Sequence, residues 1–382
     1  MPGSEMLARG IIEKIGLEHS EIRFYNHEGD ELSSDEPVTD HQAGIKYILD
    51  TLTNKQCGCL HDLSDLDAVG HRVTHGGNRF RKSMLIDEGV FNEIARFAEL
   101  APLHNPHNLK GIEAMQNAVP GIRQVAVFDT AFHKTIPEYA FMYAIPYYLY
   151  EKYGIRRYGF HGTSHYYVAI RACEILNVNI HQQKIITCHL GNGSSVAAIK
   201  EGKSIDTSMG FTPAEGLIMG TRPGDLDVSI LPYIMKKEGM ECEEVNTLMN
   251  EKSGMLGISG ISSDMREIEK VIRETGDARA RLSMEMFFYR IRKYIGAYAA
   301  IMNGLDILVL TGGIGENCHE ISTGLCHELD FLGIELKPEQ ETHPNSTERI
   351  LSSEHSRVKV MVIPTNEELV IAQESWKVIF EN

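Results

Sequence analysis

Short apolar runs alternate with longer stretches of helical periodicity along the whole chain. Residues 21–32 predict a strand that runs into a glycine turn, and residues 40–52 predict a helix. Residues 66–77 and 121–133 predict two further strands, and the second of these leads to Asp129. Both of these strands therefore end in polar side chains.

The second half of the chain repeats this alternation. Residues 158–176 turn into a helix, and residues 184–199 form two strands around a glycine turn. A long helix over 278–304 precedes an apolar strand over 305–317, and one helix face carries Phe287, Ile291, Ile295, Tyr298 and Ile301. Mixed strands and helices with glycines and charges at strand ends predict an α/β fold that binds ligands at those ends.

Length and composition narrow the class of protein. A chain of 382 residues is long for one core and suggests two domains. A net charge of −16 argues against nucleic-acid and anionic-membrane partners, so local arginines must hold any anionic ligand. Seven scattered cysteines form no disulfide or zinc pattern, and no run reaches the length of a membrane span. We expect a cytoplasmic protein that binds neither nucleic acid nor a membrane.

The turn in "KIITCHLGNGSSVAAI" (184–199) allows two interpretations. Gly191 and Gly193 let consecutive N–H groups converge on an anion, and Ser194 and Ser195 add hydroxyl donors. The same letters are typical of a tight β-hairpin. The motif alone therefore leaves a hairpin and a phosphate cradle open.

The motif "TGGIGEN" (311–317) poses the same choice, with Gly312, Gly313 and Gly315 after an apolar strand. Neither motif has the spacing of a dinucleotide or P-loop site. The motif "GTRPGDLD" (220–227) favours phosphate binding, because it places the guanidinium of Arg222 among glycines.

Other candidate residues also have simpler interpretations. His161 and His165 have a spacing that zinc ligands use, which leaves a metallohydrolase open, but no glutamate follows in the HExxH pattern. Taken alone, Arg72 is typical of a surface ion pair, Asp129 of a turn and Glu367 of a solvated helix start.

Motifs along nearly the whole chain resemble, in order, those of the acetate kinases and their propionate and butyrate kinase relatives. They are "GHRVTHGG", "LAPLHNP", "VFDTAFH", "RYGFHGTSH", "HLGNGSS", "TSMGFTPAEGLIMGTRPGDLD", "SGISSDMRE", "TGGIGEN" and "IPTNEEL". The resemblance implies reversible transfer of the ATP γ-phosphoryl group to acetate, with Mg²⁺ or Mn²⁺, by a homodimer. It also implies two ribonuclease-H-like domains, as in actin-like ATPases, around a cleft. We expect residues 1–131, completed by the C-terminal helix 368–382, to form the first, and residues 132–367 the nucleotide-binding second.

The resemblance also assigns roles to residues. The expected catalytic residues are Arg72, Asp129, His161 and Arg222, with His104 nearby, and Glu367 is expected to organise the metal. The expected acyl pocket comprises Arg72, Thr74, Leu103, Phe160 and Pro213. The expected nucleotide site comprises His189, Asn192, Gly193, Asp264, Met265, Arg266, Gly312, Gly313, Ile314, Gly315 and Asn317.

The start of the chain departs from the family pattern. Nothing in residues 1–26 matches the family's strand, glycine-serine turn and second strand, so we expect the first domain to lack its first two strands. The strand over 21–26 would then lack its neighbour, because ribonuclease-H-like sheets have the order 3-2-1-4-5. The alternatives to an active acetate kinase are a propionate kinase and a nucleotide-binding member that is inactive.

Overall fold

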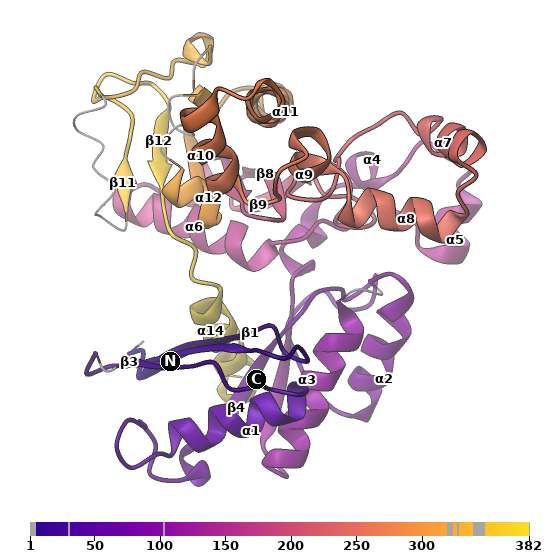
Figure 1. Cartoon of the computed structure of the whole chain (residues 1–382). Helices are drawn as coiled ribbons and strands as arrows, with labels where there is room; N and C mark the ends of the chain where they lie inside the picture. Colours follow the sequence, from indigo (N-terminus) through magenta and orange to yellow (C-terminus); the bar gives the residue numbers. More distant parts are fainter. Residues whose placement is uncertain are drawn as a thin grey trace. The chain divides into compact units, whose positions relative to one another are not determined.

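The chain folds into two compact units that both contain strands and helices (Figure 1). The computed structural model describes residues 5–29, 31–101, 104–318, 324–326, 328–338 and 348–381. Unit 1 comprises Met1–Ala131 with Glu368–Asn382, and unit 2 comprises Phe132–Glu367. The predicted α/β class is confirmed.

Unit 2 is built on one six-stranded sheet with the order β11-β12-β10-β7-β8-β9. Its strands are β7 (Lys184–Leu190), β8 (Ser194–Lys200), β9 (Lys203–Thr207), β10 (Ile307–Thr311), β11 (Arg349–Ile350) and β12 (Lys359–Val362). β12, β10 and β7 are parallel, whereas β7, β8 and β9 form an antiparallel meander. In chain order, β9-β8-β7-β10-β12 is the predicted 3-2-1-4-5 arrangement.

Apolar side chains alternate across this sheet and bury both of its faces. Ile186 and Leu308 point into a core shared with α11 (Ala278–Met302) and α10 (Met265–Thr275). The adjacent residues Ile185 and Ile307 point into a core shared with α6 (Gly162–Leu176). Figure 1 shows α6 on one side of the sheet and α10 and α11 on the other. Near-continuous apolar runs are what a sheet covered on both faces requires.

The long helix α11 differs in one position from its predicted apolar face. Phe287, Ile291, Ile295 and Tyr298 are buried, but Ile301 is 53% exposed. The buried face continues through Met302 instead, and Ile301 lies at the edge of that stripe. The remaining elements of unit 2 are α4 (Glu138–Phe141), α5 (Tyr148–Tyr153), α7 (Ile230–Glu238), α8 (Cys242–Glu251), α9 (Gly254–Ser259), α12 (Gly312–Asn317) and 3₁₀ turns at Ile180–Gln182 and Asp330–Leu332.

Unit 1 contains two three-stranded sheets, β1-β2-β3 and β4-β6-β5, in the part that the structure describes. The strands are β1 (Ala8–Glu13), β2 (Glu21–Asn26), β3 (Glu31–Ser34), β4 (Ala68–Val73), β5 (Met84–Leu85) and β6 (Arg123–Phe128). The helices are α1 (His41–Leu52), α2 (Glu88–Arg96), α3 (Asn105–Ala118) and α14 (Glu367–Phe380), with 3₁₀ turns at Leu63–Asp65, Phe97–Glu99 and, between the units, Ala131–Thr135.

The expectation that the 21–26 strand lacks a neighbour is wrong. β2 is the central strand of its sheet and pairs antiparallel with β1 on one side and β3 on the other. The apolar pattern missed β1 because Ile11 and Ile12 are its only adjacent large apolar residues, with Gly10 before them and Glu13 after them. In this sheet, β1 rather than β2 lies at an edge.

The C-terminal helix α14 packs directly on β4. A Cβ on Gly70 would lie 2.5 Å from a methyl carbon of Ile371 and 2.5 Å from Ser375 Oγ. Glycine at this position therefore lets the helix approach the strand closely.

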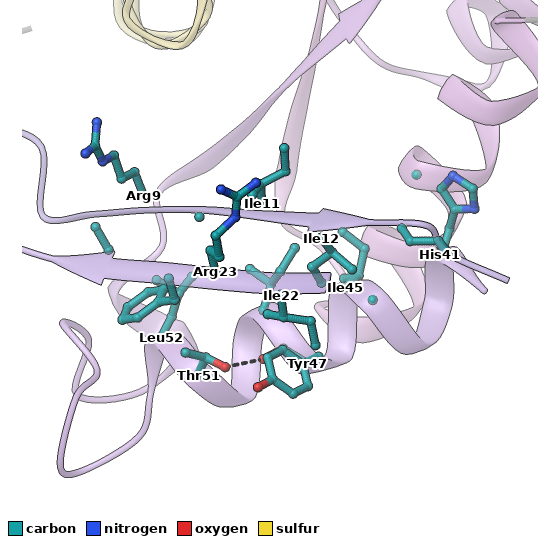
Figure 2. A pocket seen from close by; sticks show the side chains of 17 residues that line it. Arg9, Ile11, Ile12, Ile22, Arg23, His41, Ile45, Tyr47, Thr51 and Leu52 are labelled. Atoms are coloured by element: carbon teal, nitrogen blue, oxygen red, sulfur yellow. Dashed lines mark hydrogen bonds between the residues drawn. The ribbon is translucent and has the colours of Figure 1, made fainter. Parts of the chain in front are cut away.

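A pocket of about 350 Å³ lies between β1, β2 and α1 (Figure 2). Its lining is mainly apolar and includes Ile12, Ile22 and Ile45. In Figure 2, Arg9 and Arg23 extend to the opposite side of the sheet from α1. None of the predicted site residues lines this pocket, so the candidate chemistry lies elsewhere. Among the described residues, the helices are too short or too polar to cross a bilayer.

Candidate functional site

The glycine turn of residues 191–193 is the tip of a hairpin. The last pair of the β7–β8 ladder is Leu190 with Ser194. Gly191 N–H donates to the carbonyl of Gly193 (3.1 Å), and Ser194 Oγ donates to the carbonyl of Gly191 (2.9 Å). The hairpin interpretation is therefore confirmed for the backbone. This conformation does not by itself exclude ligand binding, because the N–H groups of Asn192 and Gly193 take no part in the described backbone hydrogen bonds of the turn.

Arg222 and His161 converge on Gly193 at this tip. A Cβ built on Gly193 would lie 2.9 Å from Arg222 Nη2 and 3.5 Å from His161 Nε2. A larger residue would push the guanidinium away, so glycine keeps the cation and the imidazole close to the backbone. Unit 2 thus brings together three of the predicted residues.

The backbone around Arg222 holds its guanidinium in place. Nη1 donates to the carbonyl of Pro213 (2.6 Å), and the carbonyl of Arg222 accepts from Met219 N–H (2.9 Å). Gly254 fits against this loop, since its Cβ would lie 2.2 Å from the carbonyl oxygen of Met219. Pro213, predicted for the acyl pocket, therefore positions the cation through its carbonyl.

No carboxylate of the described residues forms an ion pair with Arg222. Burial lowers the pKa of its guanidinium from the ordinary value. Arg222 is half-buried, and a cation partly withdrawn from water without an acidic partner carries a desolvation cost that a bound anion reduces.

His161 precedes α6 in the left-handed conformation, with φ of 57° and ψ of 26°. Such a backbone is strained for a residue with a side chain and is often associated with function. Its ring lies 4.2 Å, between centroids, from that of His189 on β7. His189 Nδ1 is hydrogen-bonded to Ser164 Oγ (2.8 Å), which fixes the second ring as well.

Asn192 joins the hairpin tip to the loop that carries Arg222. Its carbonyl accepts from Gly220 N–H (3.0 Å), and a Cβ on Gly220 would lie only 1.8 Å from Asn192 Oδ1. The hairpin tip and the loop that carries Arg222 are therefore packed against each other and hydrogen-bonded.

The motif "TGGIGEN" ends β10 and begins the short helix α12. Gly312 has a φ of +80°, and its Cβ would lie 2.7 Å from the carbonyl oxygen of Leu190. The pairing of Thr311 with His189 places this turn beside the hairpin. No atom lies within 4 Å of a Cβ on Gly313, and Asn317 Nδ2 donates to the Gly313 carbonyl (2.9 Å). Gly313 therefore offers open space, whereas Gly312 is needed for packing.

The other residues predicted to bind nucleotide differ in how far they are exposed to a ligand. Asp264 caps α10 and forms an ion pair with Arg266 (2.6 Å), whose side chain is 86% exposed. The side chain of Met265 is 4% exposed and belongs to the hydrophobic core, so the predicted contact of Met265 with nucleotide would be made by its backbone. Ile314 packs against the same core, and Gly315 is buried.

Glu316 is a site residue that sequence reasoning missed. Its Oε1 accepts from Gly312 N–H (2.9 Å) and from Thr365 N–H (3.2 Å). It thereby ties the glycine turn to the segment that leads to Glu367, whose Oε2 accepts from Thr163 Oγ1 (3.1 Å). An acidic residue among glycines in "TGGIGEN" was the available signal.

Unit 1 brings together a second group of predicted residues. Arg72 at the end of β4 donates through Nη2 to Asp129 Oδ2 (2.7 Å), and Asp129 follows the parallel strand β6. Asp129 is fully buried, whereas the side chain of Arg72 is 41% exposed. Thr74 is buried next to them, and its N–H donates to Asn108 Oδ1 (3.1 Å). The ion-pair interpretation of Arg72 is correct in this structure, although its partner is an interior carboxylate.

Of three further predicted site residues, the structure describes two. Phe160 is 1% exposed and packs with Met209 and Met219. His104 lies at the start of α3. Leu103 lies outside the described residues.

The histidines that the structure describes do not form a metal centre with acidic or thiol partners. In the described part of the chain, no group of three or more His, Cys, Asp or Glu side chains could hold a metal ion. His165 is fully buried between Thr187 and Ser195, to which its two ring nitrogens are hydrogen-bonded. The geometry thus gives no support to a zinc hydrolase.

Comparison with known proteins agrees with this arrangement. The model of the acetokinase family matches residues 2–373. An acetate kinase of Halothermothrix orenii is 50% identical over 380 residues, which are 99% of this chain and 95% of that protein. An acetate kinase of Thermoanaerobacterium thermosaccharolyticum is 52% identical over 374 residues, which are 98% of this chain and 93% of that protein.

Solved structures give the same result. The structure of Porphyromonas gingivalis acetate kinase has a TM-score of 0.91 at 46% identity, and the match covers 99% of this chain and 95% of that one. The structure of a propionate kinase from Francisella tularensis has a TM-score of 0.90 at 41% identity, with 98% and 94% covered. The chain therefore belongs to the acetokinase family and is a phosphotransferase.

Proposed function

We propose that the chain transfers the γ-phosphoryl group of ATP reversibly to acetate, giving ADP and acetyl phosphate, in a metal-dependent reaction. Relatives that are about 50% identical over nearly the whole chain are named acetate kinases. The observation that carries the proposal is the guanidinium of Arg222, held beside Gly193 and His161 with no acidic partner among the described residues. This is the arrangement that a transferring phosphoryl group needs.

The acceptor explains why no general base is required. A carboxylic acid with a pKa near 4 is already ionised at neutral pH and is itself the nucleophile. Catalysis then consists of positioning two anions and neutralising the charge that spreads over the phosphoryl oxygens. Fixed cations and N–H donors provide this positioning and neutralisation. Unit 2 offers Arg222, His161 and the hairpin tip for this purpose, and unit 1 offers Arg72.

The two groups have separate proposed roles. In unit 2, Arg222 and the hairpin tip bind the phosphoryl oxygens, and His161 donates to them. In unit 1, Arg72 binds the acetate carboxylate and Thr74 lines the acyl pocket. The ion pair with Asp129 keeps the Arg72 guanidinium oriented.

Mg²⁺ suits the carboxylates that are present. Asp129 and Glu367 offer oxygen ligands, and the described residues hold no larger cluster of ligating groups. Mg²⁺ is typically bound by one or two carboxylates with water and substrate phosphates, unlike structural zinc. When bound, the ion would neutralise phosphate charge and orient the phosphate chain, and Mn²⁺ can replace it.

Adenosine is proposed to bind along "TGGIGEN" and the start of α10. The open space at Gly313 and the exposed side chain of Arg266 leave room for a base and a ribose. ATP is therefore proposed as donor in preference to pyrophosphate.

The test is product formation by the whole chain. With ATP, Mg²⁺ and acetate, acetyl phosphate trapped as the hydroxamate should form in equal amount to ADP, and omission of acetate or the metal should abolish both. ADP formation without acetyl phosphate, turnover with pyrophosphate alone, or nucleotide binding without turnover would each refute the proposal.

Acetate is proposed as the first substrate and propionate as the second. Similarity to the Francisella propionate kinase supports keeping propionate in the assay. One methylene is worth about 1–3 kcal/mol of discrimination, so both acids should react. A clear preference for butyrate would contradict this pocket assignment.

We also propose a cytoplasmic homodimer. All seven cysteines are free thiols, as a reducing compartment allows. A group of large apolar and aromatic side chains is exposed on and beside α4, α5 and α7, as expected of an interface if they are contiguous in space: Tyr139, Tyr147, Tyr148, Tyr153, Val228, Ile230 and Tyr233. Light scattering should give twice the 42.8 kDa chain mass, and a monomer would exclude the dimer.

A further inference from the structure

A row of hydrogen-bonded side chains runs from the interior of unit 2 to His161. Thr187 Oγ1 lies 2.7 Å from His165 Nδ1, and His165 Nε2 lies 2.8 Å from Ser195 Oγ. Ser195 Oγ in turn lies 2.8 Å from His161 Nδ1. Thr187, His165 and Ser195 are fully buried and come from β7, α6 and β8. The inner ring nitrogen of His161 is therefore bonded to a chain that water does not reach.

The number of protons in this row is limited. A serine hydroxyl has one hydrogen, and Ser195 is flanked by two ring nitrogens. If both nitrogens donated to the Ser195 oxygen, the buried hydroxyl hydrogen would have no acceptor among the described contacts of Ser195, so one nitrogen donates to Ser195 and the other accepts from it. Burial holds the pKa of His165 well below its usual value, so that ring is neutral and carries one N–H.

These constraints leave two arrangements of the protons. In the outward arrangement, Thr187 donates to His165 Nδ1, His165 Nε2 donates to Ser195, and Ser195 donates to His161 Nδ1. Neutral His161 then carries its proton on Nε2. In the inward arrangement every bond is reversed, and the Nε2 of neutral His161 has no proton.

The outer nitrogen faces the predicted phosphoryl site. His161 Nε2 and Arg222 Nη2 both lie near the position of a Cβ on Gly193 (3.5 and 2.9 Å). The nearby guanidinium disfavours a second positive charge on His161. A phosphoryl oxygen bound here can accept a hydrogen bond from neutral His161 only in the outward arrangement.

We propose that Ser195 and His165 are positioning residues that hold neutral His161 with its proton on Nε2, ready to donate to a phosphoryl oxygen. The role rests on the proposed function. Reversing the row turns the Ser195 hydroxyl and exchanges the tautomers of both rings: His161 loses its Nδ1 proton and takes one up at Nε2, so its charge and the total number of protons are unchanged. Ser195 acts on His161 directly, and His165, supported by Thr187, fixes the direction in which Ser195 donates.

Histidine tautomers can be measured without any turnover. The whole chain labelled with ¹⁵N-histidine would be examined by two-bond ¹H–¹⁵N correlation, with His161 assigned by its loss in His161→Gln. Spectra would be recorded without and with inorganic phosphate as the probe. We expect the Nε2–H tautomer of His161 in the phosphate-containing sample and a several-fold rise in the Nδ1–H tautomer in Ser195→Ala. Thr187→Val should cause a smaller change in the same direction.

Kinetics supply the second readout. Ser195→Ala should lower kcat about five- to tenfold, the effect of losing one hydrogen bond, with KM for ATP and acetate within about twofold. Ser195→Thr keeps the hydroxyl and should recover most of the activity. Ser283→Ala removes a fully buried hydroxyl from α11 and is the matched control, with wild-type tautomers and kcat expected.

An Nδ1–H tautomer of wild-type His161 with phosphate, or an unchanged tautomer in Ser195→Ala, would overturn the proposal. Equal losses of kcat in Ser195→Ala and Ser283→Ala would also overturn it, because a general packing defect would then explain both. Failure of the proposed function can be told apart from failure of this proposal. If the wild type shows no turnover, the proposed function is wrong, and the tautomer spectra still test whether Ser195 and His165 position His161.

Discussion

Arg72 and Arg222 are both predicted to bind anions, yet their surroundings are opposite. Arg72 is 41% exposed at the end of β4 and is paired with the fully buried carboxylate of Asp129. Arg222 is held by backbone carbonyl contact beside Gly193, no carboxylate in the described structure pairs with it, and burial lowers its pKa. Arg72 is thus stabilised by the protein itself, whereas the most effective partner for Arg222 is a ligand.

The ion pair of Arg72 is expected to contribute to the stability of the fold, whereas Arg222 is expected to contribute mainly to the reaction. A buried charge without a partner costs stability and is retained where function requires it. A buried ion pair, by contrast, is strongly destabilised when one member is removed. Replacement of Arg72 should therefore destabilise the protein, whereas replacement of Arg222 should not.

The largest effect on activity is expected for Arg222→Ala. Loss of this cation should lower kcat by roughly 10²–10³ or more, because its main interaction is with charge in the transition state. The KM for ATP should change much less. Steady-state kinetics would check this, with Arg281→Ala, an exposed arginine on α11 of the same unit, as control. Near-normal turnover of Arg222→Ala would show that the guanidinium does not meet the phosphoryl group.

Arg72→Ala and Arg222→Ala are expected to differ in their effect on the free energy of unfolding. Arg72→Ala leaves the buried Asp129 without its cation and should lower the free energy of unfolding by about 1–3 kcal/mol, less than for a fully buried pair because Arg72 is partly hydrated. Arg222→Ala should leave it unchanged or raise it. Trp376, the only tryptophan, lies in α14 and reports on unit 1, and calorimetry would follow the whole chain. Lower stability of Arg222→Ala than of Arg72→Ala would reverse the comparison.

Acid is expected to weaken unit 1 through His75. Burial lowers the pKa of His75 to about 4, whereas an unfolded histidine titrates near 6.5. Between these values the unfolded chain binds the proton and the folded chain does not, so stability is lost as the pH falls from about 6.5 towards 4. At pH 5 the loss should be about 2 kcal/mol relative to neutral pH.

Urea unfolding followed by Trp376 fluorescence at pH 7 and pH 5 would measure this loss. In His75→Asn the amide oxygen can still accept from Gly77 N–H, as His75 Nδ1 does (2.9 Å), but no titrating group remains. The variant should therefore lose less stability between the two pH values. An identical loss in both proteins would assign the acid sensitivity to other groups.

The smallest effect is expected at Thr74, which is 4% exposed near Arg72. Valine has nearly the same shape, so Thr74→Val should change kcat/KM for acetate by less than about threefold and preserve the order acetate, propionate, butyrate. A change in that order, measured with the three acids side by side, would show that the hydroxyl and not the volume selects the substrate.

Much of unit 2 could be predicted from the sequence because its signals are local. Long apolar runs such as that of β7 and the glycine turns between elements predicted both the strands and the position of the candidate site. The strands of unit 1 were harder to predict from the sequence, since β1 has only two adjacent isoleucines and its pairing with β2 depends on tertiary contacts.

The parts of the site that escaped prediction depend on long-range contacts. Glu316 became recognisable only when its carboxylate was found between Gly312 and Thr365. The core position of Met265 could not be told from a ligand contact by the motif alone. Asp129 lies 57 residues from Arg72, and a local motif does not show that Arg222 has no acidic partner among the described residues, so the contrast between the two arginines emerges only from the structure.

The most direct test is the reverse reaction, observed by ³¹P NMR with the whole chain, Mg²⁺, ADP and acetyl phosphate. We expect the acetyl phosphate signal to be replaced by that of ATP, at a rate at least about 100-fold lower for Arg222→Ala than for the wild type. Persistence of acetyl phosphate in the wild-type sample, or equal ATP formation by both proteins, would contradict the claim that Arg222 serves phosphoryl transfer between acetate and ATP.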